Sequence, residues 1–143
     1  MSHKRKTLLG ALWVATLVML PGATIASTPM EPMHVGDATF ISGGVGMRER
    51  ARLFEEVAGY DLLVSFANRE TGAFLTGVEV TLQREHHSSI DITANGPYLF
   101  AKLPPGHYTL TAALPGWQTR TREVDVVTGQ RPRLYVTFVP ETQ

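Results

Sequence analysis

The sequence predicts a mainly β fold, an antiparallel sandwich of seven strands with one N-terminal amphipathic helix. Apolar and polar residues alternate with a period of two in about seven short stretches between Leu62 and Phe138. Residues typical of turns, chiefly Gly, Pro and Asn, separate these stretches. Only residues 47–59 of the chain after its apolar start carry apolar residues at helical spacing.

Residues 1–26 are typical of a signal peptide. A basic start (residues 3–6) precedes an apolar run (7–20), and small residues suit a signal-peptidase cut after Ala26. The alternative is an uncleaved transmembrane anchor. The apolar run is about 13 residues long, against roughly 20 needed to cross a bilayer. We therefore expect cleavage, a periplasmic or secreted location, and no membrane insertion afterwards.

The composition after that cut argues against several classes of function. The chain has 13 Lys and Arg and 13 Asp and Glu, and the leader holds three of the basic residues and none of the acidic ones, which leaves a net charge of −3. An acidic domain without a basic cluster is a poor binder of nucleic acid. Cysteine is absent, which excludes disulfides, thiolate metal sites and a lipidated cysteine.

Two segments precede the predicted sandwich. Residues 27–38 contain two prolines and no periodicity, which predicts a flexible leader. Residues 39–59 combine a short strand at 39–41, the glycine-rich Gly43–Gly46 and the helix, for which Gly59 is a natural stop. The predicted apolar stripe of this helix consists of Met47, Ala51, Phe54 and Ala58, with Leu53 and Val57 beside it.

The alternation predicts that residues 60–140 form the sandwich. It is clearest where Val78, Val80 and Leu82 alternate with polar residues, as in a strand with one wet face. The predicted strands cover residues 62–67, 78–83, 90–93, 98–101, 108–112, 123–126 and 134–138. We expect Phe100, Leu110 and Val136 to be buried.

The most distinctive stretch is Gly96–Ala112, which is typical of a strand, a corner and a second strand. Pro104 and Pro105 withdraw two backbone donors and end the first strand. Gly106 permits the tight turn that follows. Tyr108 is placed for its hydroxyl to bond back to the corner backbone, as in other sandwiches. These four residues are predicted to form a structural corner.

Five stretches together resemble the carboxypeptidase regulatory-like domain, a small immunoglobulin-like or transthyretin-like β-sandwich found in many exported bacterial proteins. They are Gly77–Leu82, Gly96–Phe100, Leu103–Ala112, Pro115–Trp117 and Val126–Gln130. The resemblance covers roughly residues 62–138, and residues 43–59 are similar to the front half of some short proteobacterial periplasmic proteins. It implies a fold but no activity, because such domains serve as accessory, adhesive and carbohydrate-binding-like modules.

The sequence offers no catalytic residue, cofactor or metal ligand set. The turn Thr93–Gly96 lacks an acidic residue that the family often has there, which argues against a cation at this turn. His86 and His87 beside Glu85 leave a weak metal site open, against a solvated hairpin tip. Gly43–Gly46 before a helix suits either a phosphate cradle or close backbone packing at a hinge, and the missing Lys-Ser/Thr ending favours packing.

Three aromatic residues are candidates for a ligand surface. Trp117, Tyr98 and Tyr135 suit a platform for a sugar or peptide. The alternative for Trp117 is a plug at the end of the sandwich. Our prediction is a non-catalytic module that binds a periplasmic or envelope protein, through a strand edge or the groove between helix and sheet. Binding of a glycan or peptidoglycan is the second hypothesis and a hydrolase the third.

Overall fold

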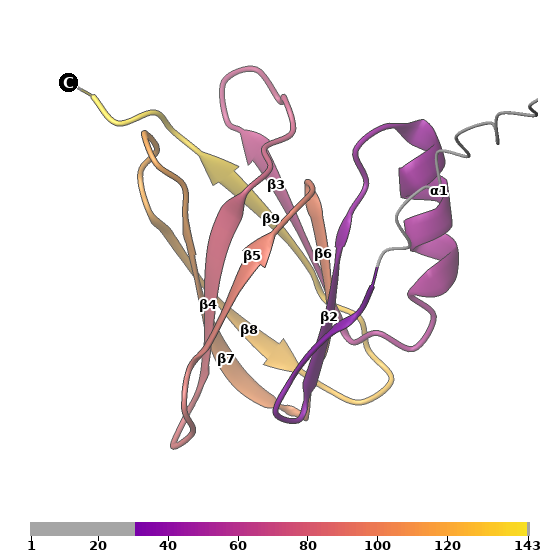
Figure 1. Cartoon of the computed structure of the whole chain (residues 1–143). Coiled ribbons are helices and arrows are strands. Elements are labelled where there is room, and N and C mark those ends of the chain that lie inside the picture. The colour runs from indigo at the N-terminus through magenta and orange to yellow at the C-terminus, as the bar shows by residue number, and fades with distance from the viewer. Residues whose placement is uncertain (1–30, 143) are drawn as a thin grey trace, which may run out of the picture.

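The computed structural model describes residues 31–142, in which nine strands and one helix form a layered sandwich (Figure 1). The predicted signal peptide (1–26) and residues 27–30 of the predicted leader lie outside the described residues. The elements are β1 (Met33–Val35), β2 (Ala38–Gly43), α1 (Met47–Glu56), β3 (Leu62–Asn68), β4 (Val78–Arg84), β5 (Ile90–Ala94), β6 (Tyr98–Lys102), β7 (Gly106–Ala113), β8 (Arg120–Val126) and β9 (Arg133–Phe138).

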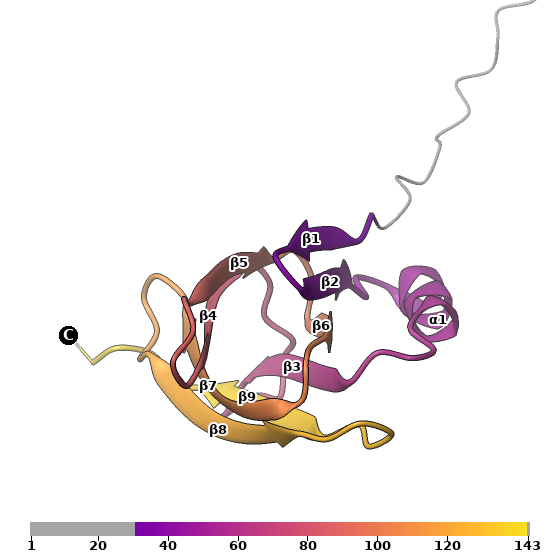
Figure 2. The same ribbon diagram turned by 90° about the horizontal axis from the view of Figure 1, so that it is seen from below.

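The strands form two sheets. Sheet A has the order β1-β2-β6-β3-β9, and sheet B has the order β5-β4-β7-β8. The helix α1 lies on the side of sheet A that faces away from sheet B, so the molecule has three layers (Figure 2). The β5–β6 connection carries the chain from sheet B to the middle of sheet A.

The mainly β prediction is confirmed, but its strand number and its uniform antiparallel pairing are wrong. Residues 33–35, predicted as flexible leader, form β1 and pair with β2. The strand predicted at 39–41 is longer, and it pairs with β6 from Thr39 to Gly43. The strands β3 and β9 pair in parallel, in a register that joins Ser65 to Tyr135. Local alternation does not encode direction, because only the path of the chain between two strands decides how they meet.

The main core lies between the two sheets. Its largest fully buried members come from both: Phe66, Leu99 and Phe138 from sheet A, and Leu82 and Leu110 from sheet B. These side chains sit on alternate positions of their strands, as the period of a pleated strand requires. Where the other face of a strand is polar, as in sheet B, alternation therefore accounts for which residues fill this layer.

A second, smaller core lies between sheet A and α1. It contains Ile41, Leu63 and Phe100 from the sheet and Leu53 and Val57 from the helix end. Phe100 is buried, as predicted, but it faces the helix, whereas Leu99 and Ala101 face sheet B. The middle of sheet A is therefore buried on both faces, which explains why β3 and β6 read as nearly continuous apolar runs.

The helix is fastened at both ends. The Glu49 carboxylate accepts a hydrogen bond of 3.0 Å from the Gly44 backbone N–H, just before the first turn. At the other end Arg131 donates to the carbonyl oxygens of Tyr60 (2.9 Å) and Val57 (2.8 Å). An acidic group at the start and a guanidinium at the end both suit the helix dipole.

The predicted apolar stripe of the helix is wrong, because the structure buries a neighbouring face of the helix. Leu53 and Val57 are fully buried, whereas Met47 is 86% exposed and Phe54 is 42% exposed. Both residue sets are apolar at helical spacing, and only the position of sheet A decides which set is covered. Among residues 31–142, no helix has the length and apolar character needed to cross a membrane.

Candidate functional site

The candidate site is an aromatic surface at the edge of the helix layer. It consists of Met47, Arg50 and Phe54 from α1, Phe74 from the β3–β4 loop, and Tyr98 at the start of β6. Met47, Arg50 and Phe54 follow one another at i, i+3 and i+7, which places them on one face of the helix.

The rings of this surface touch one another. Phe54 meets Tyr98 with ring centroids 5.4 Å apart and planes at 76°, and it meets Phe100 of the second core at the same distance and 90°. Phe74 lies 5.4 Å from Tyr98 at 49°. The bridge between Ala67 and Phe74 holds the loop residue beside the sheet. The two edge-on contacts of Phe54 and the tilted contact of Phe74 tie the surface to the second core.

Arg50 is the charged group of the aromatic surface. Its guanidinium carbon lies 4.9 Å from the ring centre of Phe74 and 5.3 Å from that of Tyr98. Its Nε is buried and has no hydrogen-bond partner in the described part of the chain. The guanidinium is therefore held chiefly by cation–π contacts, in a setting that is half shielded from water.

Much of this apolar area remains open to solvent. Phe74 is 44% exposed, and next to the surface Val45 is 57% exposed. Among residues 31–142, the exposed large apolar side chains are Met33, Val45, Met47, Phe54, Phe74, Val127 and Tyr135. Four of these seven belong to the aromatic surface or adjoin it along the chain, so the exposed apolar residues are concentrated there.

The glycine-rich segment 43–46 shapes this surface. Gly44 has φ +94°, and a Cβ there would lie 2.5 Å from Cδ2 of Tyr98. A Cβ on Gly96 would lie 2.3 Å from the Gly43 carbonyl oxygen. The glycines therefore let the chain cross close to the Tyr98 ring on its way into α1. The Glu49 carboxylate already occupies the position where the alternative reading places a phosphate.

Two of the three predicted ligand-surface residues share a face, and the third does not. Tyr98 and Tyr135 both pair with Ser65, from β6 and β9 respectively, so one strand separates them on the outer face of sheet A. Trp117 forms a bridge with Pro140 and packs partly buried against the main core. The three residues therefore do not form one platform, and Trp117 has the position expected of a plug.

The sequence reasoning missed most of the aromatic surface. The helical spacing predicts a buried position for Phe54, and Phe74 lies in a loop with no periodicity to mark it. The spacing of Met47, Arg50 and Phe54 was the one available signal.

The other predicted residues have clear structural surroundings. The Tyr108 hydroxyl donates to the Pro104 carbonyl oxygen at 2.7 Å, which closes the corner. Gly106 lies against Arg84, where a Cβ would be 2.9 Å from Cδ. His86 and His87 lie in the β4–β5 turn, and His87 Nδ1 is 2.7 Å from the Glu85 carbonyl oxygen. Within residues 31–142, no three potential metal ligands are grouped.

Comparison with known proteins assigns the fold. Residues 67–139 match the model of the carboxypeptidase regulatory-like domain, whereas no curated protein matches the chain. Nine chains of solved structures match, among them one described as the Bacillus anthracis TIE protein, at 18% identity and a TM-score of 0.43. That match covers 54% of this chain and only 16% of the other. On the family match, the chain belongs to the carboxypeptidase regulatory-like domain family.

Proposed function

We propose that this protein is an exported, non-catalytic module that binds another protein of the cell envelope through the aromatic surface. The observation that carries the proposal is the partial exposure of Phe54 and Phe74 around the half-buried guanidinium of Arg50. Exposed apolar patches on soluble domains mark interaction sites. Aromatic residues, Met and Arg are the residue types enriched at protein interfaces, where they supply most of the binding energy.

The geometry of the rings favours a protein over a glycan. A sugar stacks on a flat exposed ring, whereas Phe54 meets its neighbours nearly edge-on. Met47, on the same surface, offers a long, adaptable apolar side chain that is 86% exposed. This uneven surface suits a partner whose apolar side chains insert between α1 and the β3–β4 loop. We therefore favour the helix side of sheet A over a strand edge as the docking surface.

A glycan remains the second candidate, because of one specific observation. Tyr135 is 58% exposed on the same face of sheet A as Tyr98. An exposed tyrosine ring with a polar neighbour, here Ser65, suits stacking on a sugar. A glycan site would therefore depend on Tyr135 and little on Met47.

The proposal is tested by site-specific photo-crosslinking in the cells that make the protein. A photo-reactive amino acid replaces Met47 in one variant and Thr121, exposed on β8 of sheet B, in the control. We expect one discrete adduct from position 47 and none from position 121. The adduct disappears with Phe74→Ser, which leaves the circular dichroism spectrum unchanged because Phe74 is 44% exposed.

Two results would overturn the proposal. One is equal crosslinking from positions 47 and 121, which would indicate contact without a defined surface. The other is glycan-array binding that Tyr135→Ala abolishes and Phe74→Ser leaves intact, which would replace the protein partner by a glycan.

A further inference from the structure

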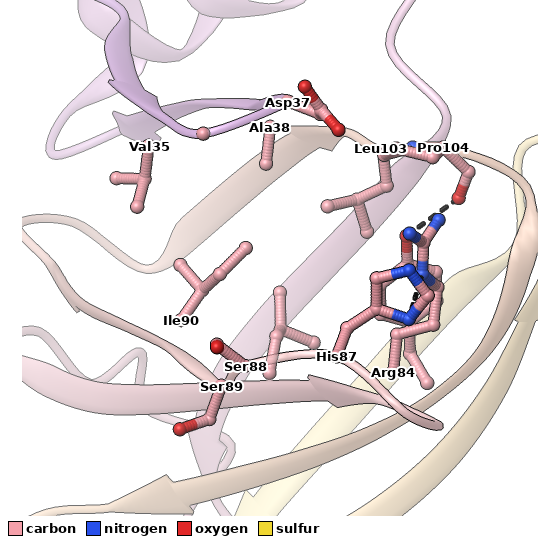
Figure 3. A pocket seen from close by; sticks show the side chains of 13 residues that line it. Val35, Asp37, Ala38, Arg84, His87, Ser88, Ser89, Ile90, Leu103 and Pro104 are labelled. Carbon is pink, nitrogen blue, oxygen red and sulfur yellow. Dashed lines mark hydrogen bonds between the residues drawn. The ribbon is translucent and has the colours of Figure 1, made fainter.

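A pocket of about 290 Å³ opens at the other end of the sandwich, away from the aromatic surface. The β1–β2 turn and the β4–β5 turn lie on either side of it (Figure 3), and Leu82, Leu103 and Tyr108 also line it. Val35, the last residue of β1, and Ile90, the first residue of β5, face each other across the hollow (Figure 3).

The pocket exists because the two sheets are not joined along this side. β1 ends sheet A and β5 ends sheet B, so the main core is open between them at this end. Leu82 and Leu103 belong to that core and yet line the pocket. An apolar group placed there would extend the core. Its transfer out of water is favourable. For scale, a cavity of about 150 Å³ holds benzene, so this pocket accommodates a ring with a short chain.

One wall carries positive charge. Arg84 and His87 lie side by side there (Figure 3), with Arg84 Nε 3.3 Å from His87 Nδ1. His87 Nδ1 is also 2.7 Å from the Glu85 carbonyl oxygen, a contact that requires Nδ1 to carry and donate its proton. The same nitrogen cannot then accept from Arg84. In that tautomer the Arg84 Nε–H finds no acceptor on His87, and the guanidinium also hydrogen-bonds the Tyr108 hydroxyl, which leaves its remaining N–H groups for a ligand.

Within residues 31–142, Arg84 forms no ion pair with a carboxylate. The ion pairs there are Arg52–Glu56, His107–Glu123 and His107–Asp125, and none includes it. The Arg84 stem lies against Gly106, where a Cβ would be 2.9 Å from Cδ. A guanidinium held in this way presents a fork of donors that matches a carboxylate.

From this geometry we infer that the pocket binds a small monocarboxylate with an apolar ring or branched tail. The tail lies on Leu82 and Leu103, and the carboxylate accepts hydrogen bonds from Arg84. Asp37 lines the opposite wall. A second anionic group on the ligand would be repelled there, so the site discriminates against dicarboxylates.

The test is an NMR titration of the ¹⁵N-labelled protein with 3-phenylpropionate and with its neutral amide, 3-phenylpropanamide. We expect saturable shifts at the amides of Ala38, Ser88 and Leu103, all of which line the pocket. Because a hydrogen bond to a charged group contributes more than a neutral one, the acid binds about tenfold or more tightly than the amide. Phenylmalonate, a dicarboxylate of similar size, binds more weakly than the monoacid.

Variants separate the Arg84 contact from general effects of charge. Arg84→Gln removes the preference for the acid, Arg84→Lys keeps part of it, and Arg122→Gln on β8 changes nothing. Three results would overturn the inference: shifts that do not saturate, equal affinity for acid and amide, or an unchanged preference in Arg84→Gln. None of them bears on the proposed protein partner, because the aromatic surface shares no residue with this pocket.

Discussion

The two outer faces of the sandwich differ. Sheet B presents a polar face to water, where Thr81 donates to Asp91 at 2.7 Å and His107 lies 2.6 Å from Asp125. Sheet A presents an apolar face, where Leu63 and Phe100 are buried under α1.

This difference explains why the outer face of sheet A is covered by a helix layer and the outer face of sheet B is not. A polar face is satisfied by water and by pairs between neighbouring strands. An apolar face has to be covered, and a helix of ten residues covers only part of it. The aromatic surface is the part left over. Its exposure is thus a consequence of the short helix, and it supplies a site that sheet B lacks.

The largest expected effect tests whether the helix layer belongs to the fold. Leu53→Ala deletes a fully buried side chain of the second core, so we expect the free energy of unfolding to fall by about 2–5 kcal/mol. Thr111→Ala, at an outward position of sheet B, should change it by about 0.5 kcal/mol or less. Urea denaturation measures both. Equal changes in the free energy of unfolding would show that the core under the helix does not stabilise the fold.

The next effect concerns the place where the chain passes from sheet B to sheet A. Gly96→Ala places a methyl group 2.3 Å from the Gly43 carbonyl oxygen, so the backbones of two segments must separate. We expect a loss of about 1–3 kcal/mol and shifted NMR signals at Gly44 and Tyr98. Ser88→Ala, in an exposed turn, is the control. An unchanged Tyr98 signal would contradict the close approach.

A smaller effect tests the corner on the inner side of sheet B. Tyr108→Phe keeps the ring and removes the hydroxyl that donates to Pro104, so the protein should lose about 0.5–1.5 kcal/mol of stability. Burial of this hydroxyl raises its pKa, and the nearby Arg84 charge opposes that rise. Thermal unfolding of the two proteins at neutral pH gives the difference. A more stable Phe variant would show that the hydrogen bond is dispensable.

The smallest effect concerns the polar face of sheet B. The hydrogen bond to Asp125 raises the pKa of His107 above 6.5, with Glu123 acting in the same direction. Because the folded pKa is the higher one, the stabilisation is present below pH 6.5 and is lost as the pH rises through the folded pKa. An NMR titration of the His107 ring should show this, and Asp125→Asn should lower its pKa. An identical midpoint in the variant would exclude the Asp125 contact.

Much of the fold could be predicted from the sequence, whereas the aromatic surface could not. The strand around Val80 alternates so regularly that its buried face is unambiguous. The stretch from Leu99 to Ala101 is apolar on both sides, so alternation cannot say which residue meets which layer. Phe74 carries no local signal, because a loop residue has a neighbour only once the chain has folded.

Local sequence patterns are enough to specify the family, the period-two strands and the proline corner, because each depends on residues close together in the chain. The tertiary structure alone decided the parallel pairing of β3 with β9, the face of α1 that is buried, and the meeting of Arg50 with Phe74 and Tyr98. These features join segments that are distant along the chain. Their geometry depends on which apolar surfaces of the two sheets and the helix cover one another. No local sequence pattern specifies this.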